Sequence, residues 1–210
     1  MRRLLRIARW FLVASAVGAT GLIFAHIALR PSLSLAQSEQ YAVYSSYIQP
    51  GLTGNSHDLG SPDGPIVIYG RTIVSNQFVS ESTFNQYRFL LGTARHADGR
   101  ISQLRKSLLI EFFASNLLNE QLEERFTLSA TYHLATDQET NLYPYEQFWK
   151  RFPKSYGYLT FSRIGFNRDL TEAFFYTEHI GGLCGEGKYV FMRKLSGQWI
   201  VEATAPVWIS

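Results

Sequence analysis

The sequence predicts an α+β fold, in which a buried central helix packs on a curved antiparallel sheet behind an N-terminal transmembrane or signal helix. Three observations lead to this prediction. An uncharged run, Trp10–Leu29, lies near the start of the chain, a strongly apolar run lies at 108–122, and β-rich segments joined by short turns fill residues 157–209. A helix followed by a meander of strands is typical of α+β domains, where the sheet buries one face against the helix.

The uncharged run near the N-terminus indicates export. It contains twenty residues and follows four arginines that lie within the first nine positions. At about 1.5 Å per residue, a helix of this length spans the roughly 30 Å hydrocarbon core of a bilayer. Arginines in front of such a segment hold the N-terminus in the cytoplasm. We therefore expect Trp10–Leu29 to contact the membrane and the residues after Arg30 to lie outside the cytoplasm.

Two fates of this segment are consistent with the sequence. In the first, Trp10–Leu29 stays in the cell membrane as an anchor. In the second, residues 1–36 are a signal peptide that is cleaved after Ala36, and the domain is secreted or periplasmic; Ser34 and Ala36 supply the small residues that cleavage needs. The run is longer than the roughly 7–15 apolar residues of most signal peptides, which favours the anchor. In both cases residues 37–210 form one exported domain.

The charge balance argues against a nucleic-acid-binding domain. The chain has 20 Lys and Arg and 17 Asp and Glu, but five of the arginines lie in residues 1–36, where there are no acidic residues. The exported part therefore has 15 basic and 17 acidic residues, a formal net charge of −2, and no basic surplus for a phosphate backbone. Cys184 is the only cysteine, so we expect no intramolecular disulfide and no multi-cysteine metal site. We predict no cofactor.

The first half of the exported domain mixes helical, loop and strand patterns. Apolar residues recur at helical spacing up to Ile48, and Pro50-Gly51 predicts the end of that helix. The glycines and prolines that follow predict a loop. The expected elements are a helix over 41–48, a loop over 50–64, a strand over 66–69 and, in the ambiguous stretch 76–103, a short helix around 84–91.

The middle of the chain predicts the central helix. In residues 108–122 apolar side chains occupy nearly every side of a helix, which is typical of a buried one. Residues 126–135 alternate between apolar and polar, the pattern of a half-buried strand. A short amphipathic helix over 145–152, stopped by Pro153, follows.

The last third predicts a meander of four antiparallel strands. Short turns between successive β-rich runs bring neighbouring strands into antiparallel pairs. The expected strands cover 157–166, 171–180, 187–195 and 198–209.

A C-terminal pattern resembles a family of uncharacterised bacterial exported or membrane-anchored proteins. The pattern is FSRIGFN at 161–167, LCGEG at 183–187, GQW at 197–199 and VWIS at 207–210. The resemblance is specific over 152–210, and it implies export but brings no activity and no catalytic residues. The layout is also similar to that of NTF2-like domains, which host both enzymes and inert binding modules.

The sharpest catalytic hypothesis pairs Cys184 with His179. A thiolate nucleophile needs a base within hydrogen-bonding reach and a third group that orients the base. Glu178 or Glu186 could orient His179. Glu178, however, should point to the opposite face of the strand from His179. The other interpretation is a hairpin whose cysteine fills a gap. Glu111, inside an apolar run, is a second candidate acid or base if it is buried.

Ligand-binding candidates lie on the predicted strand 126–135. His133, Thr131 and Ser129 alternate with apolar residues, together with Thr127, and would form the polar wall of a pocket or a solvent-exposed face. Arg163 either binds an anion or pairs with Glu172 or Glu178 across the hairpin. The acidic and histidine residues of the loops do not have metal-ligand spacing, and we predict no metal site.

These observations favour a membrane-anchored or secreted non-catalytic domain that binds an envelope protein or a small ligand in the cell envelope. The alternative is a hydrolase-type enzyme that uses Cys184 with His179, or Glu111. A structural accessory of a membrane complex is a third interpretation, although Gly18 and Gly21 do not form the Gly-x-x-x-Gly pattern of closely packed membrane helices.

Overall fold

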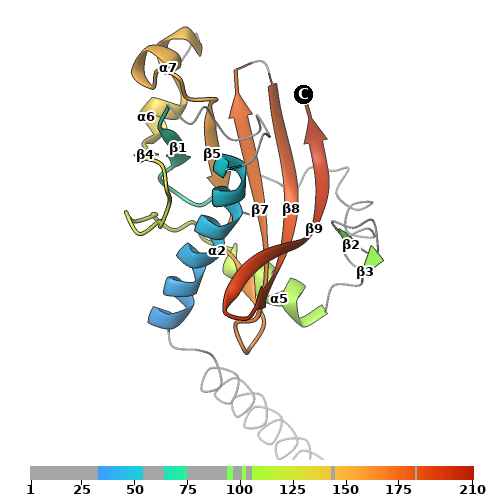
Figure 1. Ribbon diagram of the computed structural model, residues 1–210. Helices are drawn as coiled ribbons and strands as arrows, with labels where there is room; N and C mark the ends of the chain where they lie inside the picture. Colours follow the sequence, from blue (N-terminus) through green and yellow to red (C-terminus); the bar gives the residue numbers. More distant parts are fainter. Residues whose placement is uncertain are drawn as a thin grey trace, which may run out of the picture.

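The computed structural model describes residues 33–53, 64–74, 94–96, 101–102, 106–142, 145–182 and 184–210. These residues form an α+β domain (Figure 1), as the sequence predicts. The elements in chain order are α2 (Leu33–Thr53), β1 (Ile66–Tyr69), β2 (Ala94–His96), β3 (Ile101–Ser102), α5 (Lys106–Ser115), β4 (Tyr132–Ala135), α6 (Asp137–Thr140), α7 (Tyr145–Arg151), β5 (Tyr158–Phe161), β6 (Gly165–Phe166), β7 (Glu172–Gly181), β8 (Cys184–Leu195) and β9 (Gln198–Ile209).

The described strands form one mixed sheet in the order β3-β2-β9-β8-β7-β5-β1-β4, with β6 also paired to β7. The predicted C-terminal meander is confirmed, and its first strand is divided into β5 and β6. The prediction of an antiparallel sheet is wrong at one edge, where β1 runs parallel to both β4 and β5. Local turn patterns can place the meander, but β1 and β5 are far apart in the chain, and their pairing follows from tertiary packing.

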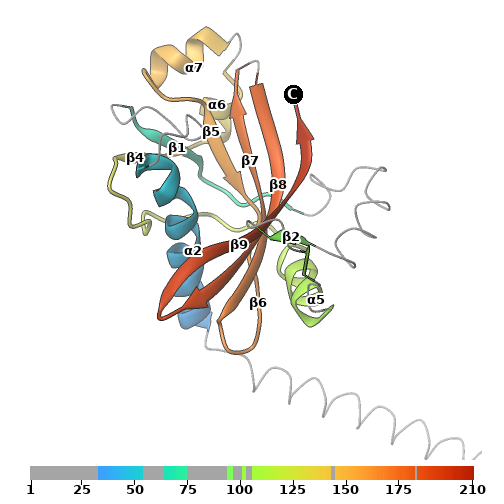
Figure 2. The same ribbon diagram turned by 45° about the vertical axis from the view of Figure 1, so that its right-hand side comes forward.

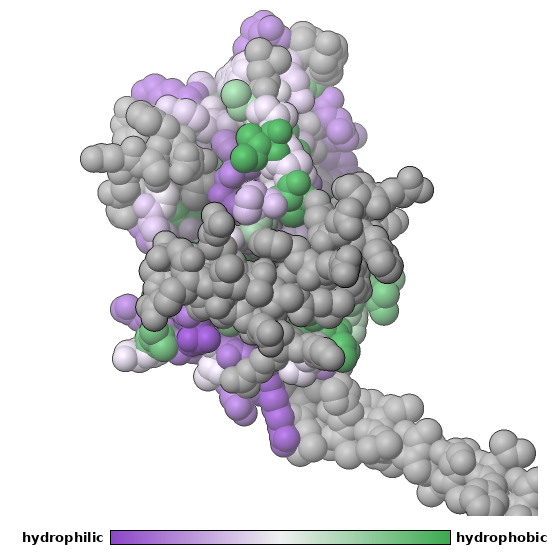
Figure 3. All heavy atoms as spheres, turned by 90° about the vertical axis from the view of Figure 1, so that its right-hand side faces the viewer, coloured by the Kyte–Doolittle hydropathy of each residue, from purple (hydrophilic) through white to green (hydrophobic). Residues whose placement is uncertain are grey.

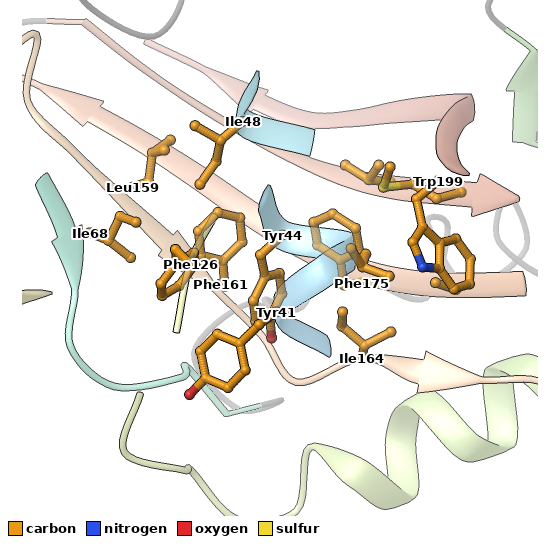
Figure 4. Packing of buried hydrophobic residues seen from close by; sticks show 14 of the residues in the cluster. Tyr41, Tyr44, Ile48, Ile68, Phe126, Leu159, Phe161, Ile164, Phe175 and Trp199 are labelled. Atoms are coloured by element: carbon orange, nitrogen blue, oxygen red, sulfur yellow. The ribbon is translucent and has the colours of Figure 1, made fainter. Parts of the chain in front are cut away.

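Helix α2 covers one face of this sheet and builds the main hydrophobic core there (Figure 4). Tyr44 is fully buried, stacks on Phe161 of β5 with ring centroids 4.5 Å apart, and meets Phe175 of β7 edge-on. Its hydroxyl donates a hydrogen bond of 2.6 Å to the carbonyl of Ser162. The core therefore lies between α2 and β1, β5, β7, β8 and β9.

The chain after α5 runs beside α2 and donates backbone hydrogen bonds to the side chains of this helix, in addition to the backbone bonds of Leu122 to Gly70 and of Ile66 in β1 to Thr131. The amides of Glu123, Thr127 and Ser129 donate to the side-chain oxygens of Tyr41, Ser45 and Gln49, respectively, which recur one helical turn apart. The predicted strand over 126–135 therefore exists only at its end, as β4. Its alternation nevertheless predicts the packing, because the apolar side chains of this stretch contact the α2 core: Phe126, Leu128, Ala130, Tyr132 and Leu134.

Helices α5 and α7 lie on the opposite face of the sheet, at its two ends (Figures 1 and 2). Phe112 of α5 packs on Phe174 of β7, in a second core. Phe148 of α7 packs on Tyr158 of β5, and Tyr158 pairs with Ile180 of β7. Since Phe174 and Ile180 are separated by an even number of residues, both helices cover the same face of β7.

The two long helices differ from the predicted ones. Helix α2 runs through Pro50 to Thr53, although a proline cannot donate the backbone hydrogen bond to the carbonyl four residues before it. Helix α5 ends at Ser115, seven residues before the predicted end, and only one of its sides is buried. The prediction of a single central helix that is buried all round is therefore wrong; the helix at the centre of the main core is α2.

The confirmed short elements are β1 and α7. The predicted membrane segment, Trp10–Leu29, and the predicted helix around 84–91 lie outside the described residues. Within the part of the chain that the structure describes, no helix is both long enough and apolar enough to cross a membrane.

Candidate functional site

Polar side chains form a row across the sheet face between α5 and α7. The strand register pairs Thr160 with Glu178, Glu178 with Gly187, and Gly187 with Trp208, so that β5, β7, β8 and β9 each contribute one position. Tyr176 precedes Glu178 by two residues and lies on the same face. We call these five residues the Glu178 cluster.

A chain of hydrogen bonds links the Glu178 cluster. The indole N–H of Trp208 donates to the hydroxyl oxygen of Tyr176 at 2.8 Å, and the Tyr176 hydroxyl donates to Oε1 of Glu178 at 2.9 Å. The Thr160 hydroxyl donates to Oε2 of Glu178 at 3.3 Å. Both carboxylate oxygens of Glu178 are thus held by side chains, one by Tyr176 of the same strand and one by Thr160 of the neighbouring β5.

Gly187 makes room for this arrangement. A Cβ atom at this position would lie 2.1 Å from the indole nitrogen of Trp208 and 2.2 Å from the Tyr176 hydroxyl oxygen. Gly185 is crowded by the same indole, whose ring would lie 2.9 Å from its Cβ. The two glycines of the C-terminal pattern therefore allow Trp208 to lie flat across β8 and reach Tyr176.

Burial keeps Tyr176 neutral. Its side chain is almost completely buried, and this burial, followed by the negative charge of Glu178, raises the pKa of the Tyr176 hydroxyl well above its ordinary value. The hydroxyl is therefore a permanent hydrogen-bond donor to Glu178 at physiological pH. Glu178 itself is half-buried, and the hydrogen bonds from Tyr176 and Thr160 fix the position of its carboxylate.

The structure brings Cys184 and His179 to the same face of the β7–β8 hairpin. Cys184 pairs with Gly181, and His179 pairs with Glu186, next to the turn. The Nε2–H of His179 donates to the backbone carbonyl of Tyr156 at 3.0 Å, and Cys184 is exposed. This ring nitrogen is therefore directed at the backbone and not at the thiol. Glu178 lies on the other face, away from His179, because the two residues are adjacent on one strand.

Glu111 is half-buried on α5, between the exposed Ile110 and the buried Phe112. Helix α5 packs against β6 and β7, whereas His133 lies on β4 at the edge of the sheet. The strands β5 and β1 separate the two elements, and the structure does not bring Glu111 and His133 together.

The three ligand-binding candidates also separate. His133 lies on β4, where its Nε2 is 3.2 Å from Oε2 of Glu139. Ser129 precedes the strand and accepts a hydrogen bond of 2.6 Å from the Gln49 side chain of α2. Thr131 is exposed. They form no shared polar wall.

Glu139 organises the region around His133. It accepts from the backbone amide of Thr136 in a capping box and pairs with Arg151 at 3.2 Å. The Thr136 backbone hydrogen bond, followed by the His133 contact, lowers the pKa of Glu139 to about 2. The carboxylate therefore stabilises the turn between β4 and α7.

We expect Glu139→Gln to reduce the free energy of unfolding by about 1–2 kcal/mol near neutral pH, because it weakens the cap and the ion pairs. A carboxyl with a lowered pKa stabilises the fold above its ordinary value of 4.5, and this stabilisation is lost as the pH falls toward 2. Urea unfolding at about pH 7 and pH 3 should show the difference between the two proteins shrinking at the lower pH. An equal difference at both values would contradict the prediction, and the exposed Glu146→Gln is the control.

The C-terminal pattern is explained in large part by structural contacts. The buried Ser162 accepts from the amide of Tyr176 at 2.8 Å and holds β5 against β7. Arg163 pairs with Glu120 at 2.9 Å, instead of with Glu172 or Glu178 as predicted. The pattern thus fixes the bend between β5 and β6.

Sequence reasoning missed Thr160, Tyr176 and Trp208 as parts of one cluster. The sequence nevertheless carried a signal for this cluster. Side chains alternate between the two faces of β7, which places Tyr176 and Glu178 on one face, and glycines at alternate positions of β8 indicate that another group approaches the strand closely there. No group of three or more His, Cys, Asp and Glu that could hold a metal ion occurs in the described ranges. Comparisons with protein-family models, curated proteins and solved structures gave no match.

Proposed function

We propose that residues 37–210 are a non-catalytic binding domain in the cell envelope, and that Glu178 binds an ammonium or guanidinium group of its partner or ligand. The observation that carries this proposal is the fixed, half-buried carboxylate of the Glu178 cluster. A carboxylate has about four acceptor positions, and Tyr176 and Thr160 use two of them. The remaining acceptors suit a cationic donor group, which forms the stronger, charge-assisted hydrogen bonds.

The neighbours of Glu178 support recognition more than catalysis. Tyr176 is a neutral donor whose pKa is raised by burial, and Trp208 and Thr160 have no ordinary role as acids or bases. The ring of Trp208 lies over Gly185 and Gly187 of β8, the strand next to that of Glu178, and aromatic rings attract cations. A fixed carboxylate suits an ammonium or guanidinium group, because such a group supplies only donors.

A titration followed through the Trp208 indole N–H tests this proposal. Its hydrogen bond to Tyr176 connects it to Glu178, so ligand binding should shift its NMR signal. We expect cadaverine or agmatine to shift the signal of Trp208 in a saturable manner. The signal of Trp199, which donates to Glu39, should not move.

Two matched variants decide the outcome. Glu178→Gln keeps the shape of the side chain but removes the charge, and it should weaken binding about tenfold or more. Glu186→Gln removes a carboxylate that is already paired with Lys188, and it should leave binding unchanged. Equal affinity in Glu178→Gln and the unaltered chain, or no saturable shift at millimolar ligand, would refute the proposal.

The hydrolase alternative makes the opposite prediction for the hairpin residues. If Cys184 is a nucleophile activated by His179, replacing it with serine must abolish turnover of the substrate while binding persists. In a non-catalytic domain, Cys184→Ser changes neither the affinity for the amine nor the fate of the bound molecule. Mass spectrometry of the ligand after incubation with both proteins separates the two functions.

A further inference from the structure

Exposed aliphatic side chains gather at the end of the domain where α2 begins. Leucine and isoleucine side chains that are half to three-quarters exposed come from α2, from α5 with its following turn, and from the β8–β9 turn. We call them the basal patch, and its members are Leu35, Ile110, Leu117, Leu118 and Leu195. Figure 3 shows hydrophobic side chains at separate places low on the described surface, with hydrophilic side chains between them.

Contacts of α2 hold the parts of the basal patch together. Gln37 donates to Oε1 of Glu120, two residues after Leu118, at 3.3 Å. Oε1 of Glu39 accepts a hydrogen bond of 2.7 Å from Nζ of Lys194, the residue before Leu195. In both ribbon views the first turn of α2, the β8–β9 turn and α5 lie at one end of the molecule (Figures 1 and 2). The patch therefore belongs to one end of the domain.

Helix α5 and the turn after it expose apolar side chains at this end. Leu108, Leu109 and Phe112 face the sheet and are buried. Ile110 on the helix is 66% exposed, and Leu117, in the turn that follows Ser115, is 73% exposed. Exposed leucine and isoleucine side chains that gather in one region mark a surface that another apolar phase or molecule covers.

The predicted membrane segment ends close to this patch. Leu33, the first described residue of α2, follows Leu29 by four positions, so the chain between them can span at most about 14 Å. An anchor over Trp10–Leu29 would therefore place the basal patch at the outer surface of the bilayer. The expected cleavage point after Ala36 lies within the first turn of α2, and cleavage there would put a positive α-amino group at the positive end of the helix dipole.

Charge around the basal patch is balanced. Lys194 pairs with Glu39, Arg163 with Glu120, and Arg193 with Glu202. Arg168, in the exposed turn beside Lys194, is followed by Asp169, so the described neighbours carry no net positive charge that would select an anionic surface. Contact with a membrane would come from apolar burial and would depend little on salt.

We propose that the basal patch inserts into the interfacial layer of the lipid bilayer and fixes the orientation of the domain on the membrane, an inference that rests on the envelope location of the proposed function and on the anchor that the sequence predicts over Trp10–Leu29. Orientation has a consequence for binding. The β7–β8 turn and Cys184 lie at the opposite end from the patch (Figure 1). Docking therefore turns that end of the sheet away from the bilayer, where an envelope partner can reach it.

A fluorescent probe on two single cysteines tests the docking in vesicles of phosphatidylcholine and phosphatidylethanolamine that carry the full chain. One protein uses the native Cys184; the other carries A114C in a C184S background, with the probe on the exposed side of α5 inside the patch. We expect spin-labelled lipids to quench the probe at position 114 about twofold or more and to leave the probe at 184 unchanged. High salt should not reduce the quenching.

A patch variant and a mass measurement complete the test. Leu117→Gln with Leu118→Gln should abolish most of the quenching, whereas Trp149→Gln, at the other end, should not. Equal quenching at both positions, or a probe at 114 that is shielded by protein and not quenched by lipid, overturns the proposal. If the mature chain instead starts at Gln37 by intact mass and does not float with vesicles, the anchor itself is refuted, and the docking is refuted with it; amine binding at Glu178 is measured separately.

Discussion

Replacing Tyr44 with alanine is expected to lower the free energy of unfolding by about 4 kcal/mol, the loss typical of removing a large buried ring. Tyr44 is fully buried at the centre of the α2 core. Its ring contacts Phe161, Phe126 and Phe175 within 6.1 Å between centroids. The cavity left by alanine cannot close easily, because these rings come from different elements and are held by other contacts.

Tyr44→Phe separates the packing from the hydrogen bond. This variant keeps the ring and loses only the bond to the Ser162 carbonyl, so it should cost about 1 kcal/mol. Equilibrium urea unfolding of the full chain in mild detergent measures both variants against the unaltered protein. A loss below about 2 kcal/mol for Tyr44→Ala would show that α2 is not the centre of the core.

The C-terminal meander could be predicted because its information is local. Each of its strands is a β-rich run, and the turns between β7 and β8 and between β8 and β9 are short, so antiparallel neighbours follow directly. The parallel position of β1 between β4 and β5 could not be predicted in this way. It depends on which buried strand fits beneath α2, and no turn sequence encodes that choice.

Helix α5 shows why the periodicity of apolar residues alone gave a wrong prediction of which side chains are buried. The run around 108–122 has apolar residues on nearly every side, which predicts a buried helix, but the sheet covers only the side with Leu108 and Phe112. Ile110 and Leu117 remain exposed. A pattern of apolar residues shows that a surface prefers to leave water, and it does not tell whether the domain's own sheet covers that surface.

The candidate site was the least predictable part. The sequence suggested Glu178 as a residue that could orient His179 or pair with Arg163, and not as the centre of a site. Its real neighbours are defined by the register of four strands, in which Thr160, Gly187 and Trp208 fall beside it. Registers of long strands are set by packing on both faces together, and one misplaced residue would have moved each side chain to the opposite face.

Gly165→Ala is expected to lower the free energy of unfolding by about 3 kcal/mol, at the upper end of the range for overpacking. A Cβ at Gly165 would lie 2.4 Å from the backbone nitrogen of Phe112. Backbone atoms of a helix cannot rotate away as a side chain does, so α5 must move off β6 as a whole. That movement strains the hydrogen bonds that join Asn116 of the following turn to the backbone of Arg163, at 2.7 and 2.9 Å.

Hydrogen exchange measures whether the damage is confined to α5. We expect the amides of α5 to exchange faster in Gly165→Ala, while those of α2 keep their protection, because the two helices pack in separate cores on opposite faces of the sheet. Gly197→Asn is the matched control: a Cβ at Gly197 would meet no described atom within 4 Å, and asparagine tolerates the positive φ of this turn. Equal stability of Gly165→Ala and Gly197→Asn would mean that α5 does not rest on β6, and Ile110 would then lose its fixed place in the basal patch.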